Sequence, residues 1–79
     1  MNAAQFAIDT SHSEVTRLRR LLKRKSSTQI QSSDELSLIK ATALAWFNNH
    51  RKALAMVIGE SAIREIDEFY RELLEMADR

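Results

Sequence analysis

Proline is absent from this 79-residue chain, and glycine occurs once, at Gly59. Turns between β-strands depend on residues that tolerate unusual backbone angles, and glycine and proline supply most of them. The common residues, among them Ala, Leu, Glu and Arg, are good helix formers. The composition therefore predicts an all-α fold, and the length predicts a single helical domain, 1–79.

Cysteine is also absent, which excludes disulfides and cysteine-bound zinc as sources of stability. Residues 1–9 lack the basic start and the long apolar run of a signal peptide. The longest apolar stretches, 41–47 and 53–59, are too short to span a bilayer. We therefore expect a cytoplasmic protein that does not act at a membrane.

A basic first helix is predicted over 11–25. Ser11 and Glu14 have the spacing of a capping box, which satisfies two backbone N–H groups at a helix start. Four apolar residues follow at helical spacing: Val15, Leu18, Leu21 and Leu22. Two interpretations stay open for residues 1–10, a flexible segment or a helical extension, and the polar run over 9–13 favours a break.

A long central helix is predicted over 33–58, after a polar linker at 26–32. Gly59 is expected to end it, because a left-handed residue costs glycine almost nothing. The helix is apolar on two sides, and a helix of this kind needs neighbours on both. One side holds Leu36, Ile39, Ala43, Trp46, Phe47, His50, Leu54, Val57 and Ile58, and the other holds Leu38, Ala41, Ala45 and Met56.

An acidic amphipathic helix is predicted over 61–78. Its apolar arc holds Ala62, Ile63, Ile66, Phe69, Tyr70, Leu73, Leu74, Met76 and Ala77. Its charged arc holds Arg64, Glu65, Asp67, Glu68, Arg71, Glu72, Glu75, Asp78 and Arg79. The short connection at Gly59 predicts an antiparallel hairpin of the second and third helices. We expect a three-helix bundle with a long central helix, completed by dimerisation.

The second apolar side of the central helix predicts a protein interface. Its residues are Leu38, Ala41, Ala45 and Met56, with Trp46 at the margin. We therefore expect a small interaction or regulatory module that binds itself, as a homodimer, or another protein.

A nucleic-acid-binding regulator is the alternative. Residues 1–31 hold six basic and two acidic side chains, a net charge of +4, whereas residues 32–79 hold six and nine, a net charge of −3. The cations crowd into the first helix: Arg17, Arg19, Arg20, Lys23, Arg24 and Lys25. They could neutralise phosphates without reading bases, because no aromatic, Asn or Gln residue interleaves with them. They could equally pair with the acidic helix at 61–78.

His50 is the single candidate for a catalytic side chain, as a general base or a pH-sensitive contact. The competing interpretation is a histidine at the edge of the core, bonded to a carbonyl or a carboxylate of the third helix. There is no thiol and no glycine-rich phosphate loop, and His12 and His50 have no acidic partner at ligand spacing. We predict no enzymatic activity, no metal, no cofactor and no small-molecule substrate.

Overall fold

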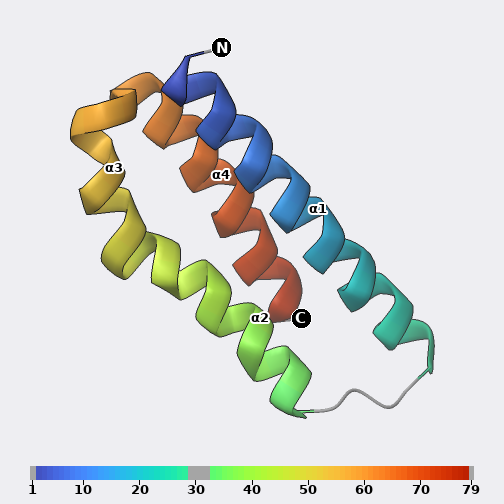
Figure 1. Cartoon of the computed structure of the whole chain (residues 1–79). Helices are drawn as coiled ribbons and strands as arrows, with labels where there is room; N and C mark the ends of the chain where they lie inside the picture. Colours follow the sequence, from blue (N-terminus) through green and yellow to red (C-terminus); the bar gives the residue numbers. More distant parts are fainter. Residues whose placement is uncertain (1, 29–32, 79) are drawn as a thin grey trace.

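The computed structural model describes residues 2–28 and 33–78 (Figure 1). These residues are almost entirely helical and contain no strand, which confirms the all-α prediction. The elements are α1 (Ala3–Thr28), α2 (Ser33–Ala45), the π-helical turn η1 (Trp46–His50), α3 (Arg51–Ile58) and α4 (Glu60–Ala77). In the part of the chain that the structure describes, no helix is long and apolar enough to cross a membrane.

The helix with neighbours on both sides is α4. It lies between α1 and the rod formed by α2, η1 and α3, and it packs against all three α-helices (Figure 1). It contributes more residues to the core than any other helix: Ala62, Ile63, Ile66, Tyr70, Leu73 and Ala77. The prediction that the helix over 33–58 is the central one is therefore wrong, and its second apolar side faces outward.

The direction of each helix follows from contacts between side chains. The α1 and α4 helices run in the same direction, because His12 contacts Phe69 and, further along both helices, Arg19 pairs with Glu72. The rod of α2, η1 and α3 runs the opposite way beside α4 (Figure 1). In the middle of α2, Lys40 pairs with the last described residue of the chain, Asp78, at 3.0 Å.

α1 is one continuous helix, so the break expected before Ser11 is wrong. Asn2 caps it, because its Oδ1 accepts a hydrogen bond of 2.7 Å from the backbone N–H of Gln5. Ser11 lies inside the helix, where it is half-buried. Three apolar residues ahead of Ser11 pack against the core: Ala4, Ala7 and Ile8. The contacts of these three residues with the core stabilise the first turns of the helix, which therefore begins at Ala3.

α1 also runs three residues past its predicted end at 25 and takes up the first half of the expected linker. The rest of that linker, residues 29–32, lies outside the described residues. At the other loop, the predicted end of the long helix at Gly59 is confirmed. Gly59 has a φ of +85°, its N–H donates to the carbonyl of Ala55, and its own carbonyl accepts from Ile63 at 3.2 Å. One glycine thus ends α3 and starts α4.

A π turn divides the long helix. The backbone N–H of Arg51 bonds to the carbonyl of Trp46, five residues back, where an α-helix uses a step of four. Such a turn inserts one extra residue, so all later residues are rotated by about 100° from the position that a regular helix gives them.

This rotation explains which side chains were misplaced by the sequence prediction. His50 and Val57 are expected on the core side, yet both are exposed, Val57 to 65%. Arg51 instead points at α4, in the place predicted for His50. Ile58 stays buried because the rotation moves it to the middle of the core side.

Candidate binding surfaces

An apolar surface, interrupted by exposed polar residues at the π turn, lies on the side of the rod that faces away from α4. We call it the outer face: Leu38, Ala41, Leu44, Ala45, Ala53, Met56 and Val57. All are exposed except Ala45, which is half-buried, and Leu38 and Met56 are exposed to 67% and 97%. No acidic residue occurs between Leu36 and Gly59. Large exposed apolar surfaces of this kind are typical of interaction sites.

The predicted interface residues do not all lie together. Leu38 and Ala41 are exposed and Ala45 is half-buried on α2. Trp46 is only 3% exposed, so its predicted place at the margin of the interface is wrong. Met56 is exposed, but the π turn rotates it by about 100° away from the line of Leu38.

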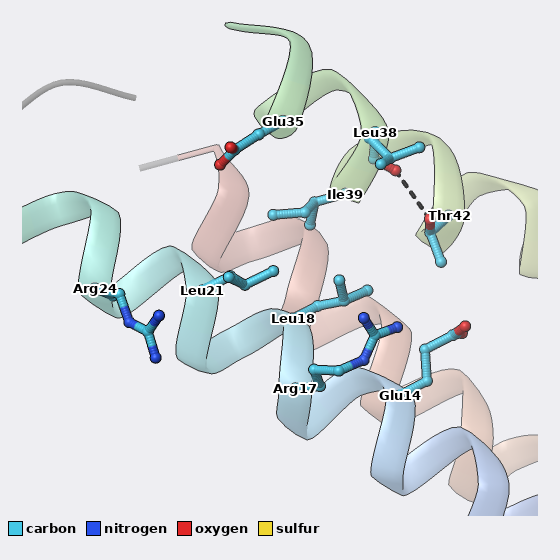
Figure 2. Close-up of a pocket in the computed structure, with 9 residues that line it drawn as sticks. All are labelled: Glu14, Arg17, Leu18, Leu21, Arg24, Glu35, Leu38, Ile39 and Thr42. Carbon is cyan, nitrogen blue, oxygen red and sulfur yellow. Dashed lines mark hydrogen bonds between the residues drawn. The ribbon is translucent and has the colours of Figure 1, made fainter. Parts of the chain in front are cut away.

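A groove opens between α1 and α2, which scarcely touch each other. Its volume is about 420 Å³, and Leu18 and Leu21 of α1 face Leu38 and Ile39 of α2 across it (Figure 2). Thr42 also lines it, with its hydroxyl donating to the carbonyl of Leu38 at 2.9 Å. Charged residues line it as well: Glu14, Arg17, Arg24 and Glu35. Leu38 therefore belongs both to this groove and to the outer face.

The second half of α1 carries a basic surface on the side away from the core. We call it the basic face: Arg17, Arg19, Arg20, Lys23 and Arg24. Arg19 is half-buried, and the other four are exposed. Together with Thr16, three of them surround a shallow hollow of about 230 Å³: Arg19, Arg20 and Lys23. The side chain of Lys25, the sixth predicted cation, lies outside the described residues.

The sequence left open whether these cations pair with the acidic helix. Arg19 does so, with a nitrogen 3.6 Å from Oε2 of Glu72 on α4. Arg17, Arg20 and Lys23 have no ion-pair partner among the described residues. Most of the basic face is therefore not neutralised by α4.

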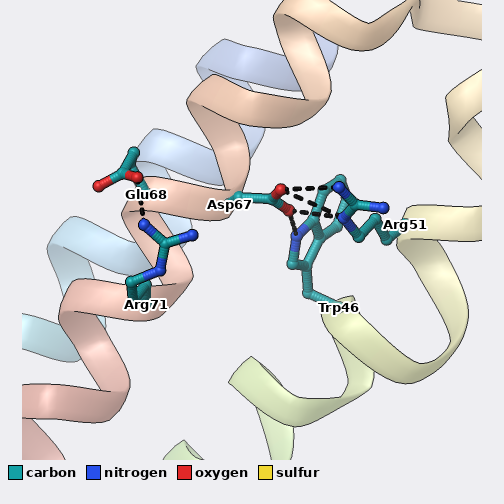
Figure 3. Close-up of polar contacts among 5 residues, drawn as sticks. All are labelled: Trp46, Arg51, Asp67, Glu68 and Arg71. Atoms are coloured by element: carbon teal, nitrogen blue, oxygen red, sulfur yellow. Dashed lines mark hydrogen bonds and ion pairs between the residues drawn. The ribbon is translucent and has the colours of Figure 1, made fainter.

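A buried polar cluster joins the π turn to α4 (Figure 3). The carboxylate of Asp67, only 7% exposed, accepts a hydrogen bond of 2.9 Å from Nε1 of Trp46. It also accepts bonds from Arg51, whose Nε is 3.0 Å from Oδ1 and whose Nη2 is 3.0 Å from Oδ2. Every polar group facing the carboxylate is thus a donor, as a buried carboxylate requires.

The charge state of Asp67 is set by two opposing effects. Burial would raise the pKa of its carboxyl, but the hydrogen bonds from Arg51 and Trp46 and the positive charges nearby outweigh it and lower the pKa. The carboxylate is therefore ionised at neutral pH. The sequence prediction placed Asp67 on the charged arc, yet Asp67 is buried. Its burial could have been inferred from the sequence, because Asp67 follows Ile63 by four residues and precedes Tyr70 by three, the spacing of one helical face.

The cluster continues to α1 through aromatic rings. Trp46 stacks on Tyr70 with ring centroids 5.5 Å apart. The hydroxyl of Tyr70 donates to Oε1 of Glu14 at 2.5 Å, and burial, aided by this bond, raises the pKa of Tyr70. The arrangement holds α1, η1, α3 and α4 together. Among the described residues, no buried polar side-chain atom is left without a partner, which indicates a structural role.

The histidines do not form a reactive site with these groups. His50 is exposed, so its predicted place at the edge of the core is wrong. His12 packs edge-on against Phe69, on a different helix. Across residues 2–28 and 33–78, no three His, Asp or Glu side chains are arranged to hold a metal ion.

Comparisons with protein-family models, with curated proteins and with solved structures find no match to this chain. Its surfaces therefore have to be interpreted from their own geometry and chemistry. Two of them are unusual for a small helical domain. These are the outer face of the rod with the adjoining groove, and the basic face of α1.

Proposed function

We propose that this protein is a helical interaction module, without catalytic activity of its own, that associates with a second copy through α2. The observation that carries the proposal is the exposed outer face, where Leu38 is 67% and Val57 65% exposed. Burying a large apolar side chain fully contributes about 1.5–3 kcal/mol. Covering this surface is therefore favourable, and no other part of the described chain covers it.

The fold offers a place for one more helix. α4 packs against both α1 and α2, whereas α1 and α2 scarcely touch each other, so a groove stays open between them (Figure 2). Leu38 lies at the rim of this groove, so a helix from outside the chain that packs against Leu38 would also cover part of it.

A second copy fits this place because α2 is self-complementary. Ala41 and Ala45 follow Leu38 by about one and two turns along the same side. In an antiparallel two-fold pair of α2 helices, Leu38 of one copy lies over Ala45 of its partner, and Ala41 lies near the axis. A large residue then meets a small one at each contact, as an isologous interface requires. Another protein with an apolar helix is the alternative occupant.

The test is the mass of the full chain in solution, from light scattering after size exclusion. We expect a dimer at tens of micromolar, and a monomer for Leu38→Asp with unchanged helicity by circular dichroism. Phe6→Asp is the matched control, because Phe6 is also exposed, to 59%, but lies on α1 outside the outer face. A strict monomer for the wild type, with no partner protein recovered by pull-down, would contradict the proposal.

A further inference from the structure

The basic face of α1 is continuous in sequence and in space. From Val15 to Thr28, the end of α1, the sequence contains no acidic residue. Between Val15 and Arg24, the sides of the helix that face away from the core carry Thr16 and the five cations of the basic face. A surface of one charge with so little else on it is a candidate for binding a polyanion.

The cations surround the outer half of the helix. Val15, Leu18 and Leu22 are buried and mark the side of α1 that faces the core. At about 100° per residue, the cations span an arc of about 160° on the opposite side. Arg19 and Arg17 lie at its two edges, and Arg20 lies near its middle. Positive charge therefore faces outward and to both flanks of the helix.

The second half of α1 also stands free at one edge of the molecule. α4 supports it on its inner side, α2 scarcely touches it, and its last turns run past the end of α4 (Figure 1). An α-helix is about 10–12 Å across with its side chains. The outer side of α1, which carries the cations, can therefore face a groove of similar width.

We propose that the basic face binds double-stranded B-form DNA, with α1 in the major groove and its flanking cations on the phosphates of both strands. The major groove is about 12 Å wide and admits a single α-helix. The stretch from Val15 to Arg24 contains no Asn or Gln to read adenine and no aromatic residue, so we assign most of its contacts to phosphates, which carry no sequence information. This surface lies on α1, so the inference stands independently of the association through α2.

An anionic membrane fits this surface less well. A helix that lies on a bilayer inserts a broad apolar side between its cations and the acyl chains. On this part of α1 the large apolar residues are directed into the core or line the groove: Val15, Leu18, Leu21 and Leu22. Only the polar side of this part of α1 is therefore left to contact a ligand, and it has no apolar residues to insert into a bilayer.

The test measures binding of the full chain to labelled duplexes of about 20 base pairs while NaCl is raised from about 50 to 300 mM. Each phosphate contact adds about −0.9 to the slope of log K against log salt. We expect a slope on the order of −4 for DNA of any sequence. The triple variant Arg17→Gln/Arg20→Gln/Lys23→Gln should make the slope shallower by about 2 to 3 and weaken binding more than tenfold at low salt.

The fold is expected to tolerate this variant, because none of its three cations has an ion-pair partner among the described residues. Circular dichroism and thermal melting check that it folds. The matched control removes three exposed cations elsewhere on the surface: Lys52→Gln, Arg64→Gln and Arg71→Gln. Equal losses in both triple variants would mean that net charge alone drives binding, and would overturn the inference.

Binding to other polyanions distinguishes DNA from the alternative ligands of the basic face. The major groove of A-form RNA is too deep and narrow for a helix, so we expect a duplex of RNA to bind more weakly than DNA at the same salt. Equal or tighter binding to the RNA duplex, to poly-glutamate or to anionic phosphatidylserine vesicles would overturn the inference. So would negligible binding to DNA at the lowest salt.

Discussion

Arg51 and Asp67 meet in a fork-to-fork arrangement, with Nε 3.0 Å from Oδ1 and Nη2 3.0 Å from Oδ2. Arg51 is the first residue of α3, directly after the π turn, and Asp67 lies in the middle of α4. Trp46, the first residue of the π turn, bonds to the same carboxylate. Through these two partners, Asp67 holds both ends of the π turn against α4. It thereby fixes how α3 is rotated relative to α4.

Asp67→Asn should destabilise the protein by about 1–3 kcal/mol, because the buried donors of Trp46 and Arg51 lose a charged acceptor. Arg51 is 41% exposed and can regain water, which keeps the loss below that of a fully buried pair. Urea unfolding at neutral pH measures the change. Glu68→Gln is the control: it removes a neighbouring carboxylate from an exposed pair with Arg71, and should cost at most about 1 kcal/mol. Equal effects of the two substitutions would show that burial of Asp67 does not matter.

The same carboxylate predicts how stability depends on pH. Because the pKa of Asp67 is lower in the folded chain than in the unfolded chain, the unfolded state takes up the proton first as the pH falls. The stabilisation is fully present above pH values of about 4 and is lost as the pH falls through the folded pKa. The difference in free energy of unfolding between wild type and Asp67→Asn should therefore shrink below pH values of about 4. A constant difference from neutral to strongly acid pH would contradict the lowered pKa.

Apolar spacing was enough to predict most of the fold. The core residues of α4 are those of its predicted apolar arc, and Gly59 ends the long helix as expected. Both features follow from local rules, since a regular helix of 3.6 residues per turn repeats its faces along its length. The start of α1 was missed because the polar run over 9–13 suggested a break, while its burial against other helices depends on residues far away in the chain.

The candidate surfaces were harder to predict, and the π turn is the reason. Nothing in Trp46–His50 marks an extra residue in the helix, so a regular repeat placed His50 and Val57 inside and Arg51 outside. The pairing of Arg51 with Asp67 joins residues 16 apart and needs the tertiary fold. Of the six cations predicted for the first helix, Arg17, Arg20, Lys23 and Arg24 are exposed, because they lie in the regular part of α1.

Deletion of Asn49 should be tolerated, since it removes the extra residue of the π turn. The turn can then close as a regular α-helix, and Arg51 and Ile58 keep their places against α4. We expect a change of less than about 1 kcal/mol in the free energy of unfolding, as for other exposed positions. Deletion of the exposed Glu65 is the control. It lies in the regular helix α4, so its loss rotates Ile66 by about 100° relative to Ile63 and should unfold the chain.

Ala41→Cys tests the geometry of the proposed dimer, because the chain has no other cysteine. Ala41 is exposed on α2 and lies near the two-fold axis of the antiparallel pair, where two copies of the new thiol come within the reach of a disulfide, with Cα atoms about 4.4–6.8 Å apart. Air oxidation at tens of micromolar should therefore give a covalent dimer on a non-reducing gel. Ala53→Cys is the control, as it is exposed on α3 but far from the axis, and it should cross-link slowly. Addition of Leu38→Asp to Ala41→Cys should slow the cross-link to the rate of Ala53→Cys. Equal rates for all three variants would mean that the thiols meet only by random collision, and that α2 does not pair with its copy.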